Sequence, residues 1–260
     1  TFAAGNDRGV KKRDMIMGYV LSFIRLLVFA LILSAFMLRL AVVSMLLGFD
    51  ENRSLRHRRQ FIRTMMPLLG IRLHVTGSLP EAPGTALYVS NHRSYLDPIV
   101  VMHDALAYPV AKAEVRSWPL IAQGVKMTGI IFVQRDEQGS RVAARNAIEK
   151  SFQEHKSIFI CPEGTTHMYR RTIEFRKAAF YIAAEQGIPV YPAAVEYADR
   201  TAAFIDQDQF LPHFLRLFGR WRIPIYVSYG PELRDQDGGR LMASTQEWID
   251  EACKQLQSSY

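Results

Sequence analysis

Apolar residues are concentrated in one long run near the N-terminus. Residues 15–49 form a 35-residue stretch in which Arg25 and Arg39 are the only charged residues and which contains no proline. A soluble surface helix carries polar side chains on its outer face, whereas about 20 apolar residues suffice to cross a bilayer. The pattern therefore predicts a helical membrane anchor over residues 15–50, preceded by a basic flank, residues 1–14.

Two geometries are open for this anchor. Arg25 and Arg39 are fourteen residues apart, which on one helix is about 21 Å along the axis and about 40° around it. A single tilted helix could cross the hydrocarbon with both guanidinium groups snorkelling outward. A hairpin or an in-plane helix could instead lie within one leaflet.

Basic residues flank the apolar stretch on both sides. They are Arg8, Lys11, Lys12 and Arg13 before it and Arg53, Arg56, Arg58, Arg59 and Arg63 after it. A crossing helix normally carries its excess of basic residues on the cytoplasmic side alone, so this symmetry favours both ends facing one anionic surface. We expect a membrane-associated protein whose partners include membrane lipids and whose active site lies on the cytoplasmic face. A buried helix pair in a soluble protein is the alternative, and a signal peptide fits less well because the apolar region is too long.

Beyond residue 70, strand-like and helix-like patterns alternate. The strand-like runs are 72–76, 86–90, 130–133, 158–161, 190–197 and 225–229, and the helix-like segments are 98–106, 142–155, 172–186 and 244–257. The last helix opens with Ser244-x-x-Glu247, the spacing of a capping box. The alternation predicts an α/β fold, with a central mostly parallel or mixed sheet flanked by helices, over a catalytic domain of residues 70–260. Residues 51–69 would be a basic juxtamembrane segment.

Net charge and cysteine content exclude several classes of protein. A formal net charge of +7 would suit nucleic acid, but the basic residues gather beside the apolar stretch and are not interleaved with aromatic residues. Anionic lipid explains them better, so we expect no nucleic-acid partner. Cys161 and Cys253 are far apart and lack metal-ligand spacing, so neither a disulfide framework, a metal site nor a cofactor is expected.

A histidine and a carboxylate stand five positions apart, at His92 and Asp97, just after a strand-like run. Neither a helix nor a strand brings residues i and i+5 face to face, so the segment must curl for them to meet. Pro98 favours this, because it keeps Asp97 out of the α region and suits the first turn of a helix. Asp97 could then orient His92 as a carboxylate does in a catalytic triad. Alternatively, Asp97 only caps the helix and His92 is a loop histidine.

The His92 and Asp97 motif is the first of four sequence blocks that follow one another along the chain. The first block is Asn91-His92-x4-Asp97, the second is G-x-x-F-x-x-R ending at Arg135, the third has the core Pro162-Glu163-Gly164-Thr165, and the fourth is Ile188-Pro189-Val190. Over about residues 70–230 the sequence thereby resembles the glycerolipid acyltransferases typified by 1-acylglycerol-3-phosphate acyltransferase. Two positions depart from the family pattern: Thr166 stands where the family has arginine, and Ala178 where it has glycine.

The resemblance implies an O-acyltransferase that uses an acyl thioester, acyl-CoA or acyl-ACP, to acylate the hydroxyl of a lysophospholipid, in the first place 1-acylglycerol-3-phosphate. His92 would be the general base, oriented by Asp97. The substrate-binding residues would be Asn91, Arg135, Glu163, Gly164, Thr165 and Lys177, with Arg135 on the acceptor phosphate and the backbone N–H groups near Gly164 and Thr165 on the thioester carbonyl.

The lost arginine at Thr166 leaves the acceptor headgroup open. Arg170, Arg171, Arg176 or Lys177 could supply the missing charge, and otherwise a different lysophospholipid or an acylated amino acid would be the acceptor. Two other classes are a lipid esterase, for which no G-x-S-x-G motif occurs in the sequence, and a non-catalytic lipid-binding protein of the same fold.

Overall fold

A seven-stranded mixed sheet forms the centre of the molecule. The computed structural model describes residues 3–81, 84–113, 129–133, 140–205 and 208–260. The strands are β1 Ile71–Thr76, β2 Leu87–Ser90, β3 Tyr108–Lys112, β4 Ile131–Val133, β5 Ile158–Ile160, β6 Val190–Tyr197 and β7 Ile223–Tyr229. Their order is β1-β7-β6-β2-β5-β3-β4, and β6 with β7 is the antiparallel pair among otherwise parallel neighbours. The predicted α/β fold is confirmed.

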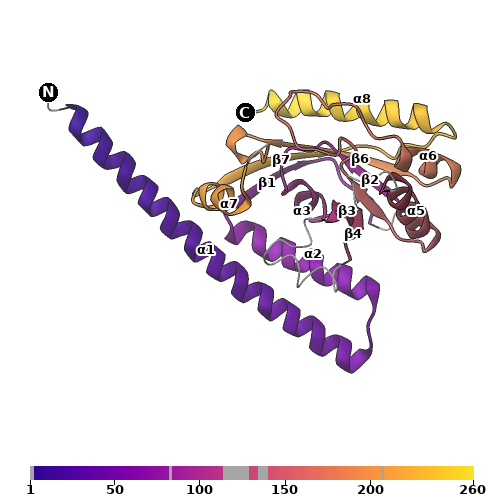
Figure 1. The fold of residues 1–260 in the computed structure, drawn as a ribbon, viewed down its shortest axis with the longest axis horizontal. Coiled ribbons are helices and arrows are strands. Elements are labelled where there is room, and N and C mark those ends of the chain that lie inside the picture. The colour runs from indigo at the N-terminus through magenta and orange to yellow at the C-terminus, as the bar shows by residue number, and fades with distance from the viewer. Residues whose placement is uncertain (1–2, 82–83, 114–128, 134–139, 206–207) are drawn as a thin grey trace.

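Helices cover both faces of the sheet (Figure 1). They are α1 Ala3–Leu47, α2 Glu51–Leu68, α3 Asp97–Val101, α5 Ser140–Gln153, α6 Ala178–Glu185, α7 Phe210–Phe218 and α8 Gly238–Gln257. One apolar core joins the sheet to α5, α6 and α8, and a second joins its other face to α2, α3 and α7. The short strand β2 is buried throughout, so its carboxyl end delivers the following loop into the interior.

The apolar stretch is one continuous helix, α1, and not a hairpin within residues 15–50. Gly48, with a φ of +76°, ends it, and α2 then returns alongside it. Residues Met15–Leu47 are long and apolar enough to cross a membrane, with a mean hydropathy of 2.6 and little burial in the protein. At 1.5 Å per residue this part is about 50 Å long, which exceeds a hydrocarbon core of about 30 Å. A straight perpendicular crossing would therefore leave apolar turns in water, so a bilayer would hold this helix tilted or in its plane.

Residues 51–69 are a helix packed on the domain instead of a simple basic connector. Asp50 caps α2 by accepting a hydrogen bond of 2.6 Å from the backbone N–H of Arg53. Leu55, Ile62 and Met65 recur on one face and are buried, which fits an amphipathic helix. The hairpin in this structure is therefore formed by α1 and α2 together.

Arg25 does not extend outward from α1, as it would in the first of the two geometries, the crossing helix with snorkelling guanidinium groups. Its side chain is buried and donates hydrogen bonds to the carbonyl oxygens of Phe218 (2.9 Å), Arg220 and Trp221 (3.2 Å) at the C-terminal end of α7. A guanidinium suits this place, because the last carbonyls of a helix lack intrahelical partners and carry partial negative charge. Arg39 remains exposed, near Gln60.

Several predicted boundaries were wrong. Helix α8 begins at Gly238, six residues before Ser244, because Asp237 caps it by accepting from the N–H groups of Gly239 (2.7 Å) and Arg240 (2.9 Å). Helix α3 ends at Val101 and α6 begins only at Ala178. Strand β3 was not predicted, because Pro109 interrupts its pattern and proline cannot donate to a strand ladder.

Candidate active site

The loop from β2 to α3 curls so that His92 meets Asp97. Nδ1 of His92 lies 2.8 Å from Oδ2 of Asp97. The same oxygen accepts hydrogen bonds from the backbone N–H groups of Arg93 (2.6 Å) and Ser94 (2.8 Å). The other oxygen accepts one from the Tyr197 hydroxyl, at 2.6 Å. The carboxylate is fully buried, and it holds both the loop and the imidazole in place.

Two opposing effects act on the proton affinity of His92. Burial lowers the pKa of the imidazole, but the nearby Cys161 and the contact with Asp97 outweigh this and raise the pKa of His92 to about 10. Burial and the adjacent Asp97 carboxylate raise the pKa of Tyr197, so its hydroxyl stays protonated and remains a donor. With Nδ1 directed to the carboxylate, Nε2 is the nitrogen left for a substrate.

Glu163 of the third block is buried and bonded to protein groups. Oε2 accepts a hydrogen bond from the backbone N–H of His92, while Oε1 contacts Nε2 of His167 (2.6 Å) and accepts one from the N–H of Ile173 (3.0 Å). The N–H of His167 donates in turn to the carbonyl of His92, at 3.3 Å. Glu163 and His167 thereby join the first block to the third, a link that the spacing of the motifs did not reveal.

A buried ion pair between Arg93 and Glu196 contacts His167, one of the two residues that join the first block to the third. Nη2 of Arg93 lies 3.2 Å from Oε1 of Glu196, and Nη1 lies 3.2 Å from Nε2 of His167. Burial raises the pKa of the Glu196 carboxyl, although Arg93 acts in the opposite direction. The sequence held no signal for this pairing, because Arg93 and Glu196 belong to segments a hundred residues apart.

The other predicted site residues differ in their positions. The Asn91 amide makes two hydrogen bonds of 2.8 Å with the backbone of Val195 and so ties the loop to β6. Gly164, with a φ of +73°, donates its N–H to the Cys161 carbonyl, at 3.1 Å, while Thr165 is exposed. Nζ of Lys177 lies 6.0 Å from the centre of the Tyr181 ring. Arg135 lies outside the described residues.

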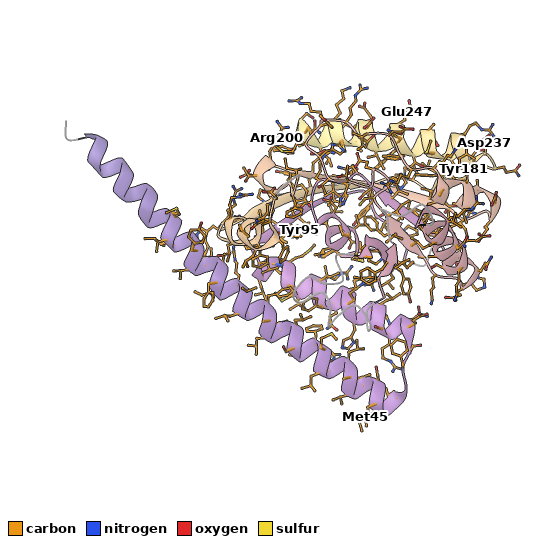
Figure 2. The ribbon with its side chains drawn as sticks, in the orientation of Figure 1. Met45, Tyr95, Tyr181, Arg200, Asp237 and Glu247 are labelled. Atoms are coloured by element: carbon orange, nitrogen blue, oxygen red, sulfur yellow. The ribbon has the colours of Figure 1, made fainter. Side chains whose placement is uncertain are left out.

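An apolar cavity of about 590 Å³ opens at His92. The third-block residues Gly164, Thr165 and Thr166 share its wall with His92, and α1 and α2 supply the opposite side. Phe29, Leu33, Phe36, Met37 and Leu40 of α1 line it together with Phe61, Ile62, Met65 and Met66 of α2. Tyr95, another lining residue, lies beside α7 (Figure 2). The sequence analysis assigned α1 to the membrane alone and did not predict that α1 and α2 line a cavity at His92. The available signal was the apolar spacing of α2, which indicated a helix with one buried face.

No group of three or more His, Cys, Asp or Glu side chains within the described ranges is placed to hold a metal ion. At the loop, the imidazole of His92 and the carboxylate of Asp97 lie together, and His92 borders the apolar cavity.

Comparisons with known proteins identify the family of the chain. The sequence model of a family described as acyltransferase matches residues 71–196. The chain is 30% identical over 178 residues to a lyso-ornithine lipid O-acyltransferase of Pseudomonas aeruginosa, covering 66% of this chain and 67% of that protein. It is 28% identical over 157 residues to a 1-acyl-sn-glycerol-3-phosphate acyltransferase of Neisseria meningitidis, covering 59% and 60%.

The fold has a solved counterpart. The crystal structure of a 1-acyl-sn-glycerophosphate acyltransferase from Thermotoga maritima superposes with a TM-score of 0.62 at 18% identity, covering 91% of this chain and 99% of that one. At this identity the likeness concerns the fold. The sequence relatives show that the chain belongs to the acyltransferase family and is an O-acyltransferase.

Proposed function

We propose that the protein transfers a fatty acyl group from an acyl thioester to the free hydroxyl of a lysophospholipid, with 1-acylglycerol-3-phosphate as acceptor and phosphatidic acid as product. The observation that carries this proposal is the His92–Asp97 contact of 2.8 Å in the wall of an apolar cavity, which His92 lines. A base beside a cavity for an alkyl chain is what acylation of a lipid hydroxyl requires.

His92 acts as general base through Nε2. Its Nδ1–H donates to Asp97, which fixes the tautomer and stabilises the imidazolium that forms. The hydroxyl proton moves to Nε2 as the oxygen attacks the thioester carbon, and the imidazolium then protonates the departing thiolate. Such a base contributes roughly 10² to 10⁴ in rate, about 3 to 5.5 kcal/mol.

The third block polarises the thioester carbonyl. The N–H of Gly164 is already bonded to the Cys161 carbonyl, so the exposed Thr165 supplies the better-placed backbone donor. Glu163 serves this arrangement by tying the turn to His92 and not by touching the acceptor.

The cavity holds the acyl chain. Burial of each methylene group contributes about 0.8 kcal/mol, so an apolar space walled by α1 and α2 retains a long chain while the carrier, coenzyme A or acyl carrier protein, stays outside. Helix α1 rests in the cytoplasmic leaflet, where the N-terminal basic flank and the exposed Arg56 of α2 meet anionic headgroups, whereas Arg58 is buried against the carbonyl of Ala107. Each Lys or Arg near such a surface contributes about 1 kcal/mol.

A second acceptor is favoured by one specific feature. Thr166 removes the cation that the family pattern places there, and the Pseudomonas relative is named for an ornithine lipid. A lyso-ornithine lipid is therefore the alternative acceptor within the same reaction.

Thiol release and product mass test the proposal. Purified protein in detergent or vesicles would receive acyl-CoA or acyl-ACP with lysophosphatidic acid or with lyso-ornithine lipid. Thiol released in step with a diacyl product is expected, and the acceptor that gives it identifies the substrate. Free fatty acid alone would indicate an esterase, and neither product would indicate a lipid-binding protein.

A further inference from the structure

The third-block turn, residues 164–166, contains no basic side chain, but the guanidinium of Arg176 lies against it. Thr166 occupies the position of the family arginine, but the guanidinium of Arg176 lies over Gly164. A Cβ built on Gly164 would be only 2.5 Å from Nε and 2.7 Å from Cζ of Arg176. The turn also lines the cavity at His92, so this guanidinium lies against a residue of the cavity wall without being part of that wall itself.

The chain around Arg176 fixes this position. Its backbone N–H donates to the carbonyl of Pro162, at 3.0 Å, and the preceding Phe175 is buried in the core with α6. The side chain of Arg176 is exposed, so its donors face solvent at the turn.

Glu163, which precedes Gly164, does not neutralise the charge of Arg176. Both oxygens of Glu163 are occupied by backbone N–H groups and His167. None of the ion pairs within the described part of the chain includes Arg176, whereas Arg93 is paired with Glu196. Lys177 lies over Tyr181. The turn thus presents one exposed guanidinium whose charge is not balanced by a carboxylate that the structure describes.

We propose that Arg176 binds the anionic headgroup of the acceptor in place of the arginine missing at position 166. This proposal rests on the proposed acyl transfer and names a residue that sets its acceptor specificity. The group bound is an oxyanion, either the phosphate of a lysophosphatidic acid or the carboxylate of an ornithine headgroup, and guanidinium matches both with two parallel hydrogen bonds.

The test is a kinetic comparison of Arg176→Gln with wild type on three acceptors: lysophosphatidic acid, lyso-ornithine lipid and the uncharged 1-monoacylglycerol. Loss of a hydrogen bond to a charged group weakens binding by about tenfold to a hundredfold. KM for the anionic acceptor should rise by about that factor while kcat changes little, and the rate on monoacylglycerol should be unchanged.

Three further variants separate binding from structure. Lys254→Gln removes the same charge from an exposed site on α8, where the side chain is 76% exposed, and should leave KM unchanged. Thr166→Arg in the Arg176→Gln background should restore a low KM, which repacking of the turn would not do. Arg176→Lys should retain part of the affinity.

The outcomes are distinguishable. A wild-type enzyme that acylates none of these acceptors overturns the proposed function itself. An active wild type with an unchanged KM in Arg176→Gln overturns the role of Arg176 alone. An equal loss on monoacylglycerol, with a lowered melting temperature and no rescue by Thr166→Arg, also overturns it by showing a structural role.

Discussion

The hydroxyl of Tyr197 donates a hydrogen bond of 2.6 Å to Oδ1 of Asp97, and both side chains are buried. The opposite oxygen already receives the two backbone N–H groups and His92. The carboxylate is therefore held from both sides, by its own loop and by the end of β6. This contact connects the catalytic loop to the centre of the sheet.

Tyr197→Phe should lower kcat by about tenfold with little change in KM for either substrate. The variant removes one donor from the Asp97 carboxylate, and a hydrogen bond to a charged group is worth about 1.5 to 3 kcal/mol, part of which is felt in the transition state. Tyr191→Phe on the same strand is the matched control, because that hydroxyl bonds to Glu232. Equal effects of the two variants on kcat would contradict a specific role for Tyr197.

The kcat/KM of the enzyme should rise with pH from neutral up to about pH 10. The raised pKa of His92, about 10, means that the base form becomes more abundant as pH increases toward that value. The rising limb of the pH profile of kcat/KM should follow the pKa of His92, because kcat/KM reports the ionisation of the free enzyme. Asp97→Asn removes a carboxylate that raises this pKa, so the limb should move to lower pH while the maximal rate falls. A wild-type profile that is flat above pH 7 would be inconsistent with a raised pKa.

Arg25→Ala should loosen α1 from the domain. The substitution leaves the carbonyls of Phe218, Arg220 and Trp221 without their donor and removes a buried side chain at the contact of α1 with α7. We expect a melting temperature several degrees lower and faster proteolysis within α1, for a loss of about 2 kcal/mol. Arg39→Ala, at an exposed position on the same helix, serves as control. Indistinguishable behaviour of the two variants would refute the anchoring role of Arg25.

Ile62→Trp should shorten the acyl chain that the enzyme prefers. Ile62 lines the cavity from α2, and a larger ring there would fill part of the 590 Å³. Rates with short-chain and long-chain thioesters would be compared at equal concentration, with melting temperature as a check on folding. Because Ile62 is buried, overpacking could cost about 1 to 3 kcal/mol. An unchanged chain-length profile in a folded variant would argue against acyl binding in this cavity.

Local patterns predicted much of the fold. Apolar runs that end at turn residues located six of the strands, and the residues of β6 were predicted with the observed bounds. Strand β3 escaped detection because Pro109 breaks the pattern locally, while its partners β4 and β5 lie farther along the chain. Helix α7 was missed because it is short and because its buried residues pack on elements distant in sequence.

The candidate site was only partly predictable for a related reason. His92 and Asp97 lie in one motif, so a local argument about Pro98 and the curl could reach their contact. Glu163 makes its decisive bonds to backbone N–H groups, which no residue pattern encodes. The cavity wall depends on α1 folding back over the domain through Arg25, a contact between residues nearly two hundred positions apart.

The central claim is that His92 deprotonates the acceptor hydroxyl, and its most direct test is thiol release by His92→Ala from an acyl thioester in the presence of the acceptor. Circular dichroism and vesicle sedimentation would establish that the variant folds and binds membranes as wild type does. The account predicts a rate lower by roughly 10² to 10⁴, with no recovery at high pH. A folded variant that releases thiol and forms diacyl product within a few-fold of the wild-type rate would contradict it.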